Sequence, residues 1–382
     1  MECKFLNHGL AIAYQDVVKP CCVWQFDNEF KNNHRLDKVD IKNWHQHPDV
    51  VQARTLLENN IWPENCGYCK HHEDGVRQDS IRLGGNNSYA NYSDDDITLE
   101  IRPGSVCNFA CQTCWPAASS RVASYYNQIN FVKDKKILLS SVDTEQTTTF
   151  KNFDFLLPVV DRIRSIVLLG GEPFYDKNCV NFLEWWNNNS NAELLVFTNG
   201  STLPVDFLNS CNKKLTLVFS IDATGRAAEY VRFGTDWNTV WKNFQTVKSM
   251  SKFNLRVNVT QSVYNYVYLS DVIDLFVDQW PNLITFGPVS ETHLNESVIP
   301  EQHREPIIAR LSKSIHDLGQ ANIEHGQMHN AINALQSIIN NLKNAHFDPV
   351  QNQKFKTFVA DMDRVKKISI SEYCPEVARY IA

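Results

Sequence analysis

Residues 97–114 read ITLEIRPGSVCNFACQTC, an alternating segment followed closely by three cysteines. The alternation of apolar and polar residues over 97–101 predicts a half-buried β-strand. The cysteines stand at positions 107, 111 and 114, so three residues and then two separate them. We therefore expect a strand whose carboxyl end leads into a cysteine-rich loop.

Further strands are expected at intervals that leave room for helices between them. The predicted strands cover residues 163–169, 194–197, 215–221, 255–259 and 283–286, and the predicted helices lie around 182–186 and 240–247. This alternation is typical of a parallel sheet with crossover helices. Because the units end near residue 300, we expect an α/β fold, namely a partial (β/α)6 TIM-like barrel rather than a closed eightfold one.

The sequence pattern divides the chain into three regions. Residues 1–94 carry five cysteines without a regular apolar period, and we expect an N-terminal cysteine-rich metal module there. The acidic residues 94–96 mark its boundary with the predicted barrel, residues 95–300. In residues 301–382 apolar side chains recur at helical spacing, which predicts C-terminal helices whose apolar stripes are packing faces.

The composition narrows the class of protein. The 382 residues are 43% hydrophobic and 21% charged, as in ordinary globular domains. The net charge of −6 indicates no basic surface for a nucleic-acid backbone. No apolar run reaches the roughly 18–20 residues that span a bilayer, and the first residues lack the layout of a signal peptide. We expect a cytoplasmic protein without a nucleic-acid or membrane partner.

The eleven cysteines are informative under that expectation, because cytoplasmic thiols more often bind metals than form disulfides. Most of them are grouped along the chain. Cys179, Cys211 and Cys374 stand alone, and we expect these three to be small buried apolar side chains.

The triplet Cys107, Cys111 and Cys114 can bind three irons of a [4Fe–4S] cluster from one short loop, because thiolates are the usual ligands of such clusters. Three ligands leave the fourth iron open, whereas a cluster that only transfers electrons normally has a fourth cysteine. The open iron can bind the amino and carboxylate groups of S-adenosylmethionine (SAM). The alternative from these residues alone is a structural zinc site or a fortuitous group of cysteines.

The triplet resembles the C-x3-C-x2-C motif of the radical SAM superfamily. Further segments resemble motifs of that family in the same order: Gly170-Gly171-Glu172-Pro173, Thr198-Asn199-Gly200, Phe219-Ser220-Ile221-Asp222 and Glu229-Tyr230-Val231-Arg232. The resemblance implies that the glycine-rich segment receives the SAM amino group and that an arginine pairs with the SAM carboxylate. The SAM-binding residues that it implies are Gly170, Gly171, Glu172, Thr198, Asn199, Ser220, Asp222 and Arg232.

The N-terminal cysteines resemble the layout of the SPASM and twitch auxiliary domains, which relatives carry after the barrel. The resemblance implies one auxiliary [4Fe–4S] cluster, and its ligands would be Cys3, Cys21, Cys66 and Cys69. Cys22 competes with Cys21 for the second position.

A structural zinc ion is the alternative occupant of the N-terminal module, because four thiolates serve zinc equally well. His71 and His72 beside Cys69 also suit zinc. We expect the other histidines, such as His45 and His47, to be surface or hydrogen-bonded core residues rather than ligands.

The resemblance implies a radical SAM enzyme that reductively cleaves SAM to methionine and a 5′-deoxyadenosyl radical, which removes a hydrogen atom from the substrate. A flavodoxin or ferredoxin would donate the electron. The auxiliary cysteines favour a peptide or protein side chain as substrate, and a small molecule or a nucleotide is the alternative. The rival from another class is a non-catalytic zinc or iron–sulfur protein that binds a partner. Neither the oligomeric state nor the fate of SAM, consumed or regenerated, follows from the sequence.

Overall fold

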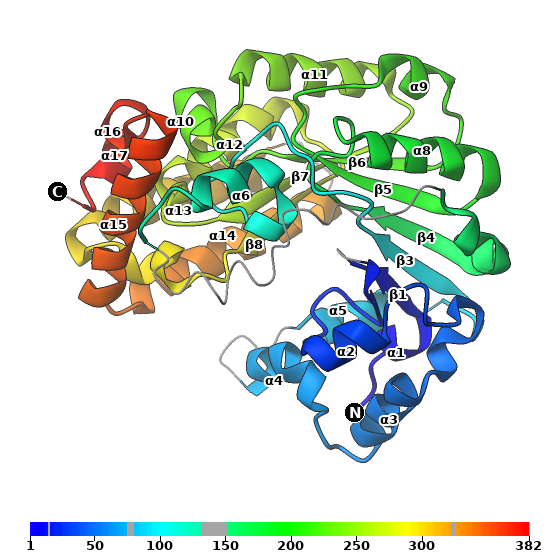
Figure 1. The fold of residues 1–382 in the computed structure, drawn as a ribbon. Coiled ribbons are helices and arrows are strands. Elements are labelled where there is room, and N and C mark those ends of the chain that lie inside the picture. The colour runs from blue at the N-terminus through cyan, green and yellow to red at the C-terminus, as the bar shows by residue number, and fades with distance from the viewer. Residues whose placement is uncertain (14–15, 75–79, 90, 132–151, 322–324, 382) are drawn as a thin grey trace. The chain divides into compact units, whose positions relative to one another are not determined.

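The computed structural model describes residues 1–13, 16–74, 80–89, 91–131, 152–321 and 325–381. In these residues the fold is mixed α/β, with eight strands in a mostly parallel sheet (Figure 1). Every strand pair with an assigned register is parallel except β1 with β2. Among the described helices, none combines the length and the apolar character that crossing a membrane would require.

The strands have short, largely buried sequences. Their bounds are β1 Gly9–Ile12, β2 Val18–Lys19, β3 Ile97–Ile101, β4 Ile163–Leu168, β5 Glu193–Thr198, β6 Leu215–Ser220, β7 Asn254–Gln261 and β8 Leu283–Pro288. All six strands expected from apolar runs and alternation are confirmed, as β3 to β8. In β7 buried and half-buried residues alternate over the whole strand, as period-2 patterning requires.

The helices lie mainly between and after the strands. Their bounds are α1 Phe5–His8, α2 Asn28–Asn33, α3 Pro48–Glu58, α4 Gly67–Asp74, α5 Ile81–Ser88, α6 Ser120–Tyr126, α8 Lys177–Asn189, α9 Val205–Ser210, α10 Gly225–Val231, α11 Trp237–Met250, α12 Leu269–Phe276, α13 Arg304–Gln320, α14 His325–Asn344, α15 Pro349–Lys366, α16 Ile370–Tyr373 and α17 Pro375–Ala378. The helices expected from the sequence are confirmed as α8, α11, α13 and α14.

The contacts divide the chain into two compact units. The first comprises Met1–Ser105, Glu145–Val196 and Asp206–Leu215, and the second comprises Val106–Thr144, Phe197–Val205 and Thr216–Ala382. This division follows the packing of the folded chain and does not coincide with the pattern-based boundaries after residues 94 and 300.

The first unit contains strands in the order β2-β1-β3-β4-β5. Strand β1 pairs in parallel with β3, with Gly9 opposite Thr98. Residues 1–94, which lack a regular apolar period in the sequence, thus contribute strand β1 to the sheet. All four residues of β1 are buried, so the strand has no alternation from which a sequence pattern could detect it.

Helix α8 of the first unit has one apolar face. Phe182 and Trp186 are fully buried on it, and the Asp176 carboxylate caps its N-terminus by accepting a hydrogen bond from the Asn178 amide. Cys179 on the same helix is also buried, as are Cys211 and Cys374 elsewhere in the chain. The expectation that these three isolated cysteines are buried side chains is confirmed.

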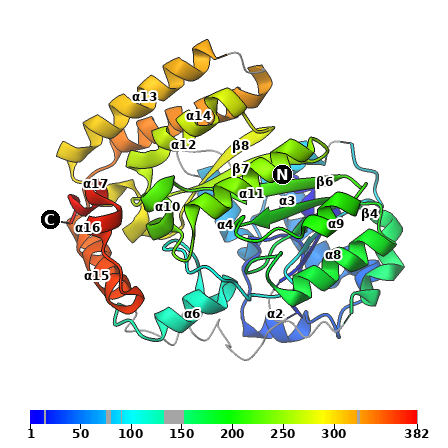
Figure 2. The same cartoon turned by 90° about the horizontal axis from the view of Figure 1, so that it is seen from above.

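The second unit contains strands β6-β7-β8 and the helices that follow them. Helices α13 and α14 lie side by side, as Figure 2 shows. Their expected apolar stripes are packing faces, since Ile307, Leu311 and Leu318 of α13 and Leu335 and Ile338 of α14 are buried. Helix α15 ends at Lys366, and the next residue, Lys367, caps it in a left-handed conformation.

Candidate functional site

Cys107, Cys111 and Cys114 lie on one loop of the second unit, and main-chain hydrogen bonds hold that loop in place. The amide of Ala110 donates to the Phe233 carbonyl at 2.8 Å, and the amide of Gln112 donates to the Val231 carbonyl at 2.8 Å. Both acceptors stand at the end of α10 or just after it. The backbone on either side of Cys111 is therefore fixed against the segment that carries Arg232.

A buried lysine holds the same loop from its other side. The Lys366 ammonium donates to the Ala110 carbonyl and to Gln112 Oε1, each at 2.9 Å. Its Nζ also lies 5.4 Å from the centroid of the Phe233 ring. This residue was not expected from the sequence, because nothing in the local pattern of α15 distinguishes Lys366 from a solvated lysine at a helix end.

Asn108 links the cysteine loop to the turn that follows β5. Its Oδ1 accepts from Asn199 Nδ2 at 2.9 Å, and its Nδ2 donates to Ser201 Oγ at 2.8 Å. Thr198 Oγ1 in turn accepts from the Gly200 amide at 3.0 Å. The expected residues Thr198 and Asn199 thus lie with the cysteine loop in the second unit, where Asn199 positions it.

Gly200 has a conformation that this turn requires. Its φ of +73° is in the left-handed region, and a Cβ there would lie 2.7 Å from the Phe219 ring. A side chain at this position would meet both backbone strain and a steric clash.

Asp222 and Arg232 form a buried ion pair, with Oδ2 and Nη1 2.8 Å apart. The other carboxylate oxygen of Asp222 accepts from the Thr260 amide at 2.7 Å. Arg232 Nε is buried and has no hydrogen-bond partner in the described part of the chain. An unsatisfied buried donor is costly, so this atom suits a ligand that brings an acceptor.

Burial and neighbouring cations act in opposite directions on the thiols of the loop. Burial raises the pKa of the Cys111 thiol, and the positive charges of Arg232 and Lys366 oppose that rise. Burial also raises the pKa of Cys114, to which Cys111 and Cys107 add. Burial lowers the pKa of Lys366 to about 7, against the negative charge of Cys111. Without a metal the Cys111 and Cys114 thiols are therefore protonated at neutral pH, and metal binding would release their protons.

The expected glycine-rich segment lies in the first unit. The Gly171 amide donates to the Gly104 carbonyl at 3.2 Å, and a Cβ on Gly170 would lie 2.9 Å from Cys179 Sγ. Glu172 is buried, and its Oε1 accepts from the Phe174 amide at 3.2 Å. Close packing within the first unit thus already requires glycine at position 170. Ser220 ends β6 of the second unit and is half-buried.

A second group of cysteines lines one small cavity in the first unit. Cys3, Cys21, Cys66 and Cys69 all face it, together with Trp24, Trp62 and Arg82, and its volume is about 20 Å³. Cys22 does not line this cavity, and the charges that act on its thiol come from Glu100, Lys19 and Arg102. His71 and His72 do not line it either. The four expected ligands thus line one cavity, whereas Cys22, whose charge also acts on Cys21, is not among the lining residues.

Burial also raises the pKa values of the thiols that line this cavity. It raises the pKa of Cys3 to about 11 and that of Cys66 to about 12. Arg82 is the nearby cation, held by ion-pair contacts to Glu73 and by a 5.6 Å approach to the Trp62 ring. Sequence analysis missed Arg82, which stands 13 residues beyond Cys69 in α5 with no motif around it.

No family model matches the sequence, and no curated protein matches it. SuiB of Streptococcus suis bound to S-adenosylmethionine is 15% identical, over 72% of this chain and 59% of SuiB, with a TM-score of 0.40. Native anSMEcpe with bound AdoMet and Cp18Cys peptide is 14% identical, over 58% of this chain and 61% of that one, with a TM-score of 0.37. TYW1 with a lysine–pyruvate adduct is 13% identical, over 72% of this chain and 89% of that one, with a TM-score of 0.35.

These similarities are too distant to support a statement about the activity of this chain. The chain also spans less than two thirds of the length of SuiB.

Replacing Lys366 tests how the cysteine loop is held. Lys366→Met keeps the length of the side chain and removes both hydrogen bonds to the loop. For the iron–sulfur cluster that the cysteine spacing predicts on this loop, we expect loss of iron to a chelator to become about tenfold faster, the usual scale for a residue that orients metal ligands. The control is Lys354→Met, an exposed lysine of the same helix. Equal rates of iron release in the two variants would contradict the anchoring role.

Proposed function

We propose that this protein is a radical SAM enzyme whose [4Fe–4S] cluster is held by Cys107, Cys111 and Cys114. The observation that supports this most directly is the buried, unsatisfied Arg232 Nε on the segment bonded to the three-cysteine loop. An arginine whose guanidinium Nε–H has no acceptor suits the carboxylate of an amino acid, and SAM carries such a carboxylate. A site for a closed electron-transfer cluster would not need such a donor.

The residues present fit a cluster of this kind. Three soft thiolates come from one loop, as iron–sulfur ligation requires. Arg232 and Lys366 place positive charge against Cys111, which favours an anionic thiolate-bound group. Gln112 Nε2 is a further buried donor without a partner among the described residues, and such donors suit the acceptor sulfurs of a cluster.

When bound, the cluster and SAM together would supply a 5′-deoxyadenosyl radical that takes a hydrogen atom from the substrate. The part of Arg232 would be to bind the SAM carboxylate, and that of Asp222 to orient Arg232. The remaining proposed SAM contacts follow the family's motifs, at Gly170, Gly171, Glu172, Thr198, Asn199 and Ser220. In the same proposal strands β3 to β8 form a partial barrel, so that residues 95–300 carry the radical chemistry and residues 301–382 a helical extension.

We assign the N-terminal cavity to an auxiliary [4Fe–4S] cluster bound by Cys3, Cys21, Cys66 and Cys69, in a twitch-like or SPASM-like module within residues 1–94. The preference for iron–sulfur over zinc rests mainly on the resemblance of the cysteine layout to the auxiliary domains, and the spread of the thiols agrees with it. No three of these sulfur atoms lie within 4.8 Å of one another in the described chain. Around one tetrahedral zinc ion they would stand about 3.8 Å apart, given Zn–S bonds near 2.3 Å.

The proposed substrate is a peptide or protein side chain, on the strength of the auxiliary cysteine layout. A small molecule or nucleotide is the second candidate. A flavodoxin or ferredoxin is the proposed electron donor.

The decisive experiment is anaerobic reconstitution followed by iron, sulfide and 5′-deoxyadenosine analysis. We expect about eight irons per chain, since each cubane cluster holds four, and SAM cleavage under reduction. Cys111→Ala should lose about four irons and all 5′-deoxyadenosine formation. Cys211→Ala, which removes a buried isolated thiol, is the matched control and should change neither. A chain that takes up only zinc and forms no 5′-deoxyadenosine would support the rival, non-catalytic reading.

Arg232→Lys tests the proposed carboxylate contact. Lysine keeps the positive charge but lacks the planar guanidinium group that can bind a carboxylate through two hydrogen bonds. We therefore expect the dissociation constant for SAM to rise about tenfold to a hundredfold, which is the range for a lost hydrogen bond to a charged group. Iron content should stay constant. Arg226→Lys, an exposed arginine of α10, is the control. Unchanged SAM affinity in equilibrium dialysis would argue against this role.

Cys21 and Cys22 can be separated by the same iron measurement. We expect Cys21→Ser to lose about four irons, and Cys22→Ser to retain them, because only Cys21 lines the cavity with the other three thiols. The reverse pattern would reassign the second ligand to Cys22.

A further inference from the structure

A third group of possible metal ligands lies in the first unit, apart from any cysteine. His34 follows the last residue of α2, His47 precedes α3, and Asp49 is in the first turn of α3. Asp49 Oδ2 lies 2.8 Å from His34 Nε2 and 4.0 Å from His47 Nδ1. One ligand atom from each residue falls within 4.8 Å of the other two, and no other trio of His, Cys, Asp or Glu in the described chain does so.

The hydrogen bonding of His34 leaves one nitrogen for a cation. Its Nδ1 lies 2.8 Å from the Phe30 carbonyl oxygen, which can only accept, so Nδ1 carries the proton. This is the orientation that metal-binding histidines usually have, with the second ring nitrogen donating to a carbonyl. In the neutral ring the lone pair of Nε2 then faces a carboxylate oxygen 2.8 Å away, and these two acceptors repel each other unless a positive charge lies between them.

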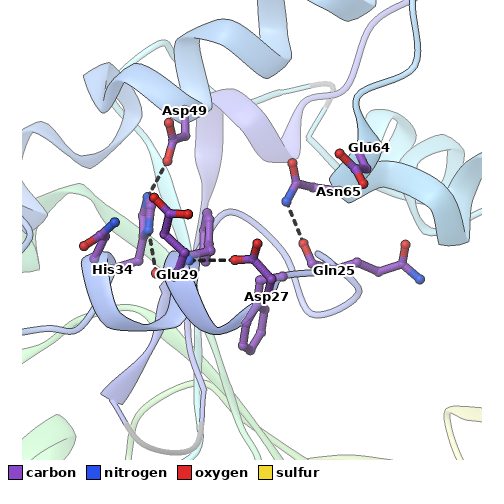
Figure 3. Close-up of a pocket in the computed structure, with 10 residues that line it drawn as sticks. Gln25, Asp27, Glu29, His34, Asp49, Glu64 and Asn65 are labelled. Carbon is purple, nitrogen blue, oxygen red and sulfur yellow. Dashed lines mark hydrogen bonds and ion pairs between the residues drawn. The ribbon is translucent and has the colours of Figure 1, made fainter.

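The surroundings shield His34 but leave the site accessible. The His34 side chain is 3% exposed, and its Nε2 makes no hydrogen bond with acceptable geometry. His34 and Asp49 line a pocket of about 580 Å³, whose other lining residues include the acidic Asp27, Glu29 and Glu64. Figure 3 shows the Asp49 carboxylate directed at the His34 ring. A cation entering this pocket would meet negative charge and then the two ligands.

We infer that His34, His47 and Asp49 form a binding site for a divalent transition-metal ion of the zinc class, with an open coordination position toward the pocket. Two imidazoles and one carboxylate suit zinc better than calcium or magnesium, which prefer oxygen ligands. In a tetrahedral site with bonds near 2.1 Å the ligand atoms stand about 3.4 Å apart. The observed 2.8 Å and 4.0 Å lie on either side of that value.

This site differs from the sequence expectation for His47, which treated it as a surface or hydrogen-bonded residue. His47 Nδ1 does accept a long hydrogen bond of 3.4 Å from the Asp49 amide, so it caps α3. That contact holds the ring near Asp49, and because Nδ1 has a single lone pair, binding of the metal by this atom would replace the long hydrogen bond. His45, by contrast, is buried and its Nε2 lies 3.0 Å from the Gly9 carbonyl oxygen, which is a structural role.

The test uses the full chain after iron–sulfur reconstitution, with Zn²⁺ as the probe. We expect zinc uptake by the wild type, and X-ray absorption at the zinc edge should show nitrogen and oxygen neighbours near 2.0–2.1 Å without sulfur near 2.3 Å. His34→Gln, His47→Gln and Asp49→Asn should each weaken zinc binding at least about tenfold at constant iron content. His346→Gln, an exposed histidine outside the site, is the control and should bind zinc as the wild type does.

Three results would each overturn the site. They are no zinc uptake by the wild type, zinc bound only through sulfur, and unchanged affinity in His47→Gln or Asp49→Asn. If the wild type takes up no zinc, the short contact between His34 Nε2 and Asp49 Oδ2 is an ordinary hydrogen-bonded pair that needs no metal ion. Since the side chains of His47 and Asp49 are 27% and 45% exposed, their variants carry the test even if His34→Gln fails to fold. Because the readout is zinc, the proposed radical activity can fail without affecting this result.

Discussion

The buried carboxylate of Asp222 is the constraint on which the second unit depends. Its two oxygens accept hydrogen bonds from Arg232 and from the Thr260 amide of β7, and its main-chain carbonyl accepts from Asn265. A buried charge is expensive unless it is paired and hydrogen-bonded. Removing one partner of such a pair typically costs about 3–5 kcal/mol. The strand end, the turn after β7 and the segment after α10 are thus tied together by one side chain.

The Asp222–Arg232 ion pair is connected through the backbone to the hydrogen bonds that fix the cysteine loop. Arg232 lies between Val231 and Phe233, whose carbonyls bond the loop backbone, while Lys366 bonds the loop from α15. Two basic groups from separate elements, Arg232 and the protonated form of Lys366, therefore act on Cys111. In a low-dielectric interior such charges have more effect than at the surface, so the same groups that fix the loop also favour thiolate ligands on it.

The strands and helices could be predicted where the apolar pattern is long enough to show a period. Strands β3 to β8 and helices α8, α11, α13 and α14 meet that condition. Strand β1 does not, since four consecutive buried residues fit either a strand or a piece of helix.

The candidate sites likewise contain some features that the sequence pattern reveals and others that only the folded chain shows. Cysteine spacing grouped the residues of each candidate site, but adjacent Cys21 and Cys22 are equivalent in sequence, and only in the folded chain does Cys21 alone of the two line the cavity. Lys366 stands 256 residues from the carbonyl it holds. The trio of His34, His47 and Asp49 has no motif spacing. Such pairings depend on tertiary packing, which local pattern does not encode.

The long separation between Lys366 and the cysteine loop bears on how the protein is made. Domains fold as the chain leaves the ribosome, beginning with the N-terminal residues. The cysteine loop emerges well before α15 is translated, so during that interval its thiols lack one of their anchors. The loop therefore takes its final hydrogen-bonded form at a late stage of biogenesis, after α15 has docked, and the cluster proposed for it would gain its full support only then.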